Sequence, residues 1–158
     1  MKCLEMARVG LILLFGITTI SAAQSFKVRV LDGSNGRPLQ NQQVLISLLY
    51  DKNQTAPVVD DSSLHRTTDS VGEIEFRLPD VAPAHIWVSV RLTSPYWRCG
   101  CLAFVSTQDL LLKGVVEDRA QSKSKSPDAQ RQEIPGYILF VAHPYSLFWR
   151  LLYPLVKG

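Results

Sequence analysis

The feature that most constrains this chain is a repeated alternation of apolar and polar residues in short runs. Phe26, Val28 and Val30 alternate with basic residues, which is the period of a β-strand with one buried face. The same alternation occupies residues 73–78 and, in the longest run, residues 85–94. A helix would instead repeat its apolar residues at every third or fourth position. The pattern therefore predicts half-buried strands.

Turn-forming residues separate these runs. Residues 33–38 hold two glycines and a proline, and residues 69–72 end in a glycine that suits a tight turn. Further strands are predicted at residues 42–51 and 64–68. Strands at near-regular spacing, without a strand–helix–strand rhythm, predict a mainly β fold, specifically an antiparallel β-sandwich.

The pattern changes after Cys101. Residues 106–114 predict a short helix that Ser106 or Thr107 caps and Gly114 ends. Residues 120–133 lack large apolar side chains and are predicted to form an exposed, mobile loop. An apolar run at 135–143 then predicts one last strand.

The N-terminal segment has the three parts of a secretory signal. Two basic residues lie near its start, an apolar run follows over residues 9–20, and Ser21 and Ala23 are the small residues of a cleavage site. A membrane-spanning helix needs roughly 20 apolar residues, and this run is shorter. We expect residues 1–23 to be a signal peptide cleaved near Ala23, which makes the protein secreted or periplasmic. An uncleaved anchor is the alternative.

The charge of the chain gives no indication of nucleic-acid binding. Removal of the signal takes two bases, Lys2 and Arg8, and one acid, Glu5, so the formal net charge falls from +3 to +2. Phosphate recognition needs a clustered basic face, and the basic run at 121–126 lies in the predicted loop. We therefore expect no nucleic-acid partner.

Two stretches of the chain carry a family resemblance. Residues 36–39 read Gly-Arg-Pro-Leu, residues 68–76 read Thr-Asp-Ser-Val-Gly-Glu-Ile-Glu-Phe, and a Leu-Pro pair at 78–79 precedes the long strand. Together they resemble the carboxypeptidase regulatory-like, or transthyretin-like, β-sandwich. The resemblance implies a transthyretin-like/Ig-like sandwich over residues 24–143, with motif residues that make turns and core. The remainder is similar to small exported bacterial proteins of unassigned role.

Cysteine usage leaves two states open. Cys3 leaves with the signal, so the mature chain holds Cys99 and Cys101. In an oxidising compartment we expect a Cys99–Cys101 disulfide, which requires the backbone to bend between the two residues. Free or intermolecular cysteines are the alternative.

The histidines do not complete a metal site. A metal ion needs three or four convergent ligands, and no spacing joins His65, His85 and His143 to the cysteines. We expect no metal, no cofactor and no catalytic residue. A metal-dependent or hydrolytic enzyme on a transthyretin-like fold stays open as a third hypothesis.

Three aromatic residues, Trp87, Tyr96 and Trp97, are candidates for a sugar-stacking platform. Trp87 is out of phase with Ile86 and Val88, so we expect it on the opposite face of its sheet. Aromatic residues in sandwiches belong more often to the core. A carbohydrate-binding module that recognises a polysaccharide is therefore the alternative function.

The C-terminal segment, residues 144–158, is unusually apolar. Pro144 suits the first turn of a helix, which we expect from about Tyr145 to Tyr153. Such a helix is apolar over most of its circumference and needs cover on most sides. Docking on the sandwich, contact with a partner protein or a second copy, and peripheral membrane contact all stay open. The candidate interaction surface of this segment consists of Phe148, Trp149, Leu152 and Tyr153.

These features favour an exported, non-catalytic binding or structural β-sandwich. Its expected mode of action is protein–protein contact at the cell envelope, with an envelope protein or by self-association. The sequence does not identify the partner.

Overall fold

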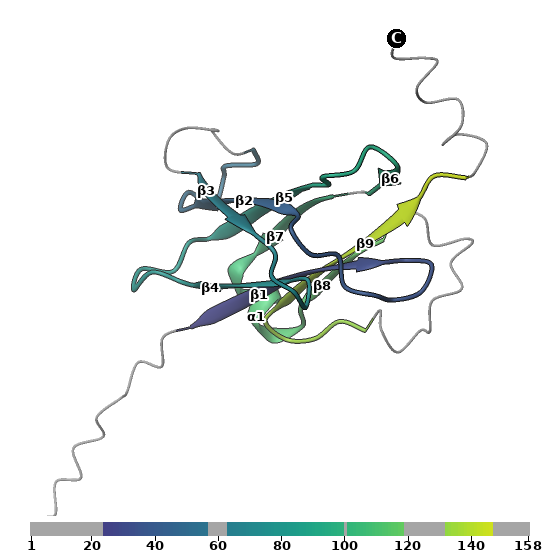
Figure 1. Ribbon diagram of the computed structural model, residues 1–158. Helices are drawn as coiled ribbons and strands as arrows, with labels where there is room; N and C mark the ends of the chain where they lie inside the picture. The colour runs from purple at the N-terminus through teal and green to yellow at the C-terminus, as the bar shows by residue number, and fades with distance from the viewer. Residues whose placement is uncertain (1–23, 57–62, 100, 119–131, 147–158) are drawn as a thin grey trace, which may run out of the picture.

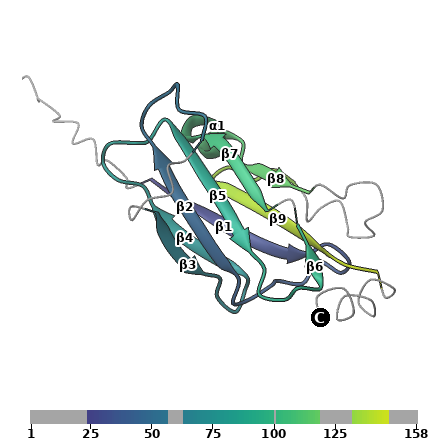
Figure 2. The ribbon, with the colours of Figure 1, turned by 90° about the horizontal axis from the view of Figure 1, so that it is seen from above.

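The computed structural model describes residues 24–56, 63–99, 101–118 and 132–146, which form two β-sheets packed face to face (Figures 1 and 2). The first sheet has the strand order β4-β1-β9-β6, and β8 also pairs with β9. Its strands are β1 (Ser25–Asp32), β4 (Glu73–Arg77), β6 (Trp97–Arg98), β8 (Val115–Glu117) and β9 (Tyr137–Pro144).

The second sheet has the order β3-β2-β5-β7 and is antiparallel throughout. Its strands are β2 (Gln43–Leu49), β3 (Leu64–Thr67), β5 (His85–Arg91) and β7 (Leu102–Ser106). One helix, α1 (Thr107–Leu112), follows β7 directly in the described chain. The mainly β prediction is therefore confirmed, and α1 lies within the residues 106–114 for which a short helix is predicted.

The hydrophobic core lies between the two sheets. The alternation read from the sequence fixes which side chains enter it, because successive side chains of a strand point to opposite faces. Helix α1 adds Leu110, which is fully buried. The strand residues of the core with the least exposure are Phe26, Val28, Val30, Val44, Ile46, Ile86, Val88, Ala103, Ile138 and Phe140.

The prediction of an antiparallel sandwich is wrong for the centre of the first sheet. Strand β9 runs parallel to β1, with Lys27 opposite Tyr137 and Asp32 opposite Ala142, and β8 is also parallel to β9. A central parallel strand is buried on both faces, so its sequence reads as a continuous apolar run. In β9, Ile138 and Phe140 belong to the main core, while Leu139 packs in a second cluster on the outer face.

The two motif stretches behind the family resemblance contact each other. The Thr68 hydroxyl donates to the Leu39 carbonyl and accepts from the Gln42 N–H, each at 2.9 Å. Gly72 has a positive φ of 70° and lies so close to Pro38 that a Cβ would clash with it. These residues therefore hold the β1–β2 connection against the β3–β4 turn, which is a structural role.

The C-terminal helix falls mostly outside the described residues. Pro144 is the last residue of β9, and the Tyr145 N–H donates to the Tyr96 carbonyl at 2.8 Å, so the described chain continues as strand to that point. The predicted helix therefore does not begin at Pro144 or Tyr145. Phe148, Trp149, Leu152 and Tyr153 lie outside the described part, as do residues 1–23 and most of the predicted 120–133 loop.

Replacement of Phe140 tests the central position of β9. The Phe140→Ala variant is expected to lose about 3–5 kcal/mol of unfolding free energy, because it leaves a cavity between the sheets. Urea denaturation followed by circular dichroism measures the loss. Val81→Ala is the control, since Val81 is 72% exposed and its truncation should change stability by less than about 0.5 kcal/mol. Equal effects for the two variants would contradict this assignment of the core.

Candidate interaction surface

The outer face of the second sheet carries apolar side chains on neighbouring strands. In β5, Ile86 and Val88 enter the core while Trp87 faces outward, as the sequence predicts for Trp87. Trp87 lies opposite Phe104 of β7 in the strand register. We call the outward residues Leu45, Trp87, Leu102 and Phe104 the aromatic face.

Two residues of the aromatic face are open to solvent. Leu102 is 40% exposed and Phe104 is 41% exposed, whereas Leu45 and Trp87 are half-buried. The Phe104 ring stacks on the His85 imidazole, with ring centroids 4.9 Å apart and an interplanar angle of 15°. Leu102 and Phe104 are therefore neighbouring exposed apolar residues on one face of β7 rather than single scattered ones.

The aromatic face ends at an unpaired strand edge. Strand β7 pairs with β5 on one side, and no other strand of the described chain pairs with it. Each of the other edges in the two-sheet arrangement carries charge: β3 has Arg66, and β4 has Glu75 and Arg77. Charged side chains on edge strands block pairing with other chains, and β7 has none.

The direction of the β7 hydrogen bonds follows from its flanks. The Val90 N–H donates to the Cys101 carbonyl at 2.9 Å, and the Thr107 N–H donates to the Ala84 carbonyl at 3.1 Å. Bonded and non-bonded pairs alternate in an antiparallel ladder. The peptide groups of Leu102 and Phe104 therefore point away from β5, toward the free edge.

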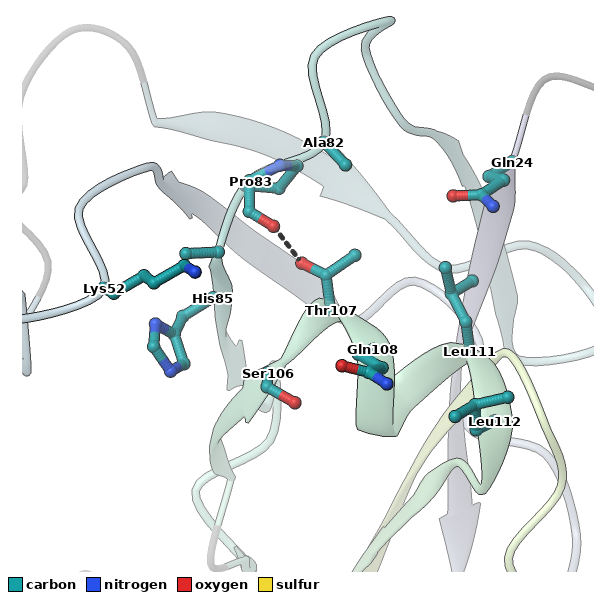
Figure 3. Close-up of a pocket in the computed structure, with 11 residues that line it drawn as sticks. Gln24, Lys52, Ala82, Pro83, His85, Ser106, Thr107, Gln108, Leu111 and Leu112 are labelled. Atoms are coloured by element: carbon teal, nitrogen blue, oxygen red, sulfur yellow. Dashed lines mark hydrogen bonds between the residues drawn. The ribbon is translucent and has the colours of Figure 1, made fainter. Parts of the chain in front are cut away.

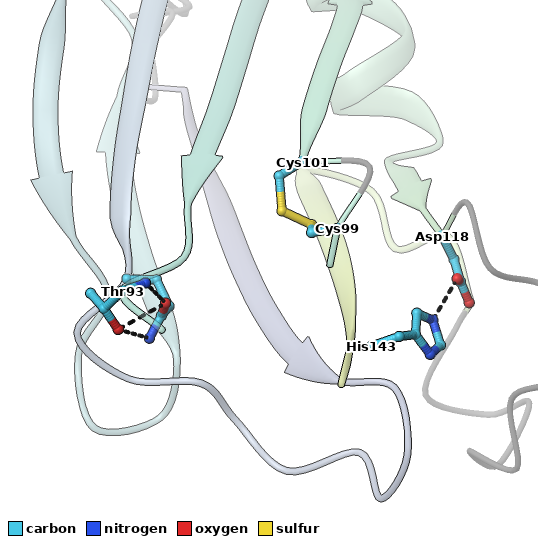
Figure 4. The surroundings of a disulfide bond; sticks show 6 residues. Thr93, Cys99, Cys101, Asp118 and His143 are labelled. Carbon is cyan, nitrogen blue, oxygen red and sulfur yellow. Dashed lines mark hydrogen bonds and ion pairs between the residues drawn. A yellow bond between two sulfur atoms is a disulfide. The ribbon is translucent and has the colours of Figure 1, made fainter. Parts of the chain in front are cut away.

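Both ends of β7 are fixed. Cys99 and Cys101 form a disulfide just before the strand, with Cα atoms 4.8 Å apart, and both residues pack against the core (Figure 4). At the other end the Ser106 hydroxyl accepts from the Asp109 N–H at 3.0 Å and caps α1. The Cα atoms of residues two apart in an extended strand are about 6.6 Å apart. The shorter separation of Cys99 and Cys101 shows that the chain bends at the cysteines, as expected for a disulfide between them.

A hollow of about 690 Å³ lies beside this surface, at the start of β5 and the end of β7 (Figure 3). Among the described residues of its lining Lys52 is the one charged residue, and Leu111 and Leu112 form an apolar wall. The Ser106 hydroxyl donates to the Asp109 carboxylate at 2.6 Å rather than to His85. It therefore acts as the N-cap of α1. The described residues that line it are Gln24, Lys52, Ala82, Pro83, Ala84, His85, Ser106, Thr107, Gln108, Leu111 and Leu112.

The three histidines lie apart and have separate roles. His65 is exposed on β3, and His85 stacks on Phe104. His143 Nε2 lies 2.8 Å from Asp118 Oδ1, and the Asp118 side chain is almost fully buried (Figure 4). Gly33 lies directly against the His143 ring and leaves no space for a Cβ. Within the described ranges, no group of three His, Cys, Asp or Glu side chains could hold a metal ion.

The predicted sugar platform is divided between the two sheets. Trp87 is central in β5 of the second sheet, whereas Trp97 lies in β6 and pairs with Pro144 of β9 in the first. Tyr96 precedes β6 and is 38% exposed.

Sequence reasoning missed Leu102 and Phe104, although the alternation in residues 102–106 was the signal that could have revealed them.

Comparison with known proteins adds little to this description. No family model matches the chain, and a search of the curated proteins finds no match. A search of solved structures finds similarity to the full-length major pilin SpaD from Corynebacterium diphtheriae, with a TM-score of 0.47 and 11% identity. The match covers 78% of this chain and 33% of the pilin, so the chain spans about a third of that protein's length. We draw nothing about function from it.

No helix among the described residues is long and apolar enough to cross a membrane. The sequence leaves membrane contact open for the C-terminal segment, and residues 147–158 of this segment lie outside the described ranges.

Replacement of Ser106 tests the cap that ends β7. The Ser106 hydrogen bond, followed by Lys113, lowers the pKa of Asp109 below its usual value of 3.8. A lowered pKa adds stability above the unfolded-state pKa, and this stability is lost as the pH falls through the folded-state pKa. Ser106→Ala should cost about 1 kcal/mol of stability at neutral pH through loss of the cap. It should also raise the Asp109 pKa, so that stability falls less steeply with acidification.

Carboxyl NMR titration measures this pKa, and urea denaturation at neutral and acidic pH measures the stability. Ser34→Ala, in a turn remote from α1 along the chain, is the control for a general effect of hydroxyl loss. An unchanged Asp109 pKa in Ser106→Ala would contradict the assigned cap.

Proposed function

We propose that this protein is an exported, non-catalytic β-sandwich that acts by protein–protein contact at the cell envelope. One observation carries the proposal: the aromatic face combines exposed Leu102 and Phe104 with an uncharged, unpaired strand edge. Large apolar side chains surrounded by polar surface mark sites where soluble proteins meet other proteins.

Export is supported by the signal pattern of residues 1–23 and by the disulfide. A Cys99–Cys101 disulfide persists in the oxidising compartments outside the cytosol. The proposed domain type is the carboxypeptidase regulatory-like, transthyretin-like sandwich. Its support is the contact between Gly72 and Pro38, which joins the two stretches that carry the resemblance.

The non-catalytic part of the proposal is supported by the hydrogen bonding in the hollow. Ser106 is engaged as a cap, and Thr107 donates to the Pro83 carbonyl at 2.6 Å. Both hydroxyls therefore have structural partners, the first turn of α1 for Ser106 and a loop carbonyl for Thr107. A metal measured in the purified protein at one equivalent would favour the enzyme hypothesis instead.

Carbohydrate binding is the second candidate function. It is favoured by Trp87 and Phe104, which lie opposite each other on neighbouring strands and face the same side. Aromatic rings of this kind can stack on sugar rings as well as on protein side chains. Stabilisation by a polysaccharide that Trp87→Ala abolishes, without any protein partner, would replace the first proposal with this one.

The experiment that tests protein contact places a charge in the aromatic face. Phe104→Lys is expected to keep the fold, because lysine is well tolerated on an exposed edge strand. It should weaken binding to the envelope partner at least tenfold, since a central aromatic residue commonly contributes more than 1.4 kcal/mol to a contact. Cross-linking in the host identifies the partner, and titration of the purified pair measures the dissociation constant.

Val81→Lys is the matched control. It introduces the same charge at another exposed apolar residue, in the connection between β4 and β5, which is not part of the aromatic face. A partner lost from Phe104→Lys and kept by Val81→Lys supports the proposal. A partner set unchanged by Phe104→Lys would show that the aromatic face is not the contact surface.

A further inference from the structure

We propose that β7 pairs edge to edge with β7 of a second copy of this chain. This inference rests on the proposed function, because it names the partner of the same surface. The pairing would join the two second sheets, each of four strands, into one continuous sheet across two molecules. Addition of a strand to an open sheet edge is a common mode of recognition.

The backbone of β7 offers the groups that such a pairing needs. The N–H and C=O groups of Leu102 and Phe104 point to the free edge, because the alternate residues Ala103 and Val105 form the hydrogen bonds with β5. Unpaired N–H and C=O groups along an edge are a template for another strand.

The charge pattern permits a second copy of β7 as the strand partner. In an antiparallel self-pairing, each residue faces a residue of the same strand, so any charge near the centre meets a like charge. Self-pairing of β4 would bring Glu75 against Glu75 of the second copy. Strand β7, with the sequence Leu-Ala-Phe-Val-Ser, has no charge to repel itself. A second copy of β7 can therefore approach this edge without charge repulsion.

The register follows from the position of Phe104 at the centre of β7. A two-fold axis beside Phe104 pairs Phe104 with Phe104, Ala103 with Val105 and Leu102 with Ser106, so that all residues of the strand are used. The two Phe104 rings then meet on the outer face, next to the Trp87 side chains of both copies. Their Cα atoms would stand about 5.5 Å apart, as in a hydrogen-bonded antiparallel pair.

The size of the strand limits the affinity. An edge of this length buries less than the roughly 1,200 Å² of a standard stable interface, so the dimer should be weak. We expect a dissociation constant in the range of about 10–500 µM, which corresponds to a concentration-dependent equilibrium rather than an obligate dimer. The local concentration at a membrane or in an envelope assembly would shift it toward pairing.

The first arm of the test measures mass against concentration. The chain, purified as its host exports it, is examined by sedimentation equilibrium from about 5 µM to about 1 mM. The mass should rise from monomer toward dimer, and Phe104→Lys should remain monomeric over the same range while Val81→Lys behaves as the unmodified chain. A chain that stays monomeric throughout overturns the inference, and so does a dimer that persists in Phe104→Lys.

The second arm tests the register by cross-linking. Under mild oxidation Phe104→Cys should give a covalent dimer linked through the introduced thiols, since about 5.5 Å between Cα atoms suits a disulfide. Leu102→Cys is the control, because the two introduced thiols would lie four residues apart along the paired strands, about 13 Å. Peptide mass spectrometry confirms that Cys99 and Cys101 are still joined to each other. Equally fast cross-linking of both variants overturns the proposed register.

The outcomes separate this inference from the proposed function. If the chain is monomeric at every concentration but Phe104→Lys still loses an envelope partner, the aromatic face binds another protein and self-pairing is excluded. If the dimer forms as proposed and no other partner depends on Phe104, the second copy is itself the protein contact. If neither a dimer nor a Phe104-dependent partner is found, both proposals fail.

Discussion

The parallel pairing of β9 with β1 is the interaction on which the rest of the structure depends. It brings residues 137–142 beside residues 27–32, and it places β9 at the centre of the first sheet, buried on both faces. Strands β6 and β8 join the sheet only through β9. The segment that precedes β7 is thereby fixed to the first sheet, while β7 itself belongs to the second. Strand β7 is therefore the last strand of the second sheet, and no further strand of the described chain pairs with it.

The outer faces of the two sheets differ in how far their apolar side chains are buried. The outer face of the first sheet buries a second apolar cluster of Leu31, Leu139 and Val141, with the buried His143–Asp118 pair at the end of β9. On the outer face of the second sheet, Leu102 and Phe104 stay exposed. Apolar surface left open beside an edge costs solubility and favours association. This asymmetry suits a protein that meets its partner through one sheet.

The sequence predicted the parts of the fold that depend on local alternation and turn chemistry. Strands β1, β4 and β5 follow the period of two, and Gly72 adopts the positive φ that its turn requires. The direction of β9 could not be predicted, because a period shows which face is buried and not which strand lies beside it. Strand β7 was missed because its short run follows the cysteines directly. Trp87 was correctly predicted to face away from the core. Its grouping with Trp97 as a sugar platform could not be judged from the sequence, because the sequence does not show which sheet β6 joins.

The anchoring of β7 at both ends bears on how well it can bind. The Cys99–Cys101 disulfide holds its start against the core, the Ser106 cap joins its end to α1, and the His85 ring supports Phe104 from the side. Ordering a loose strand would cost conformational entropy for each residue that the partner immobilises. Here much of that ordering is already achieved by folding. A short edge can then associate with measurable affinity, because the hydrogen bonds and the two Phe104 rings form between surfaces that need little rearrangement.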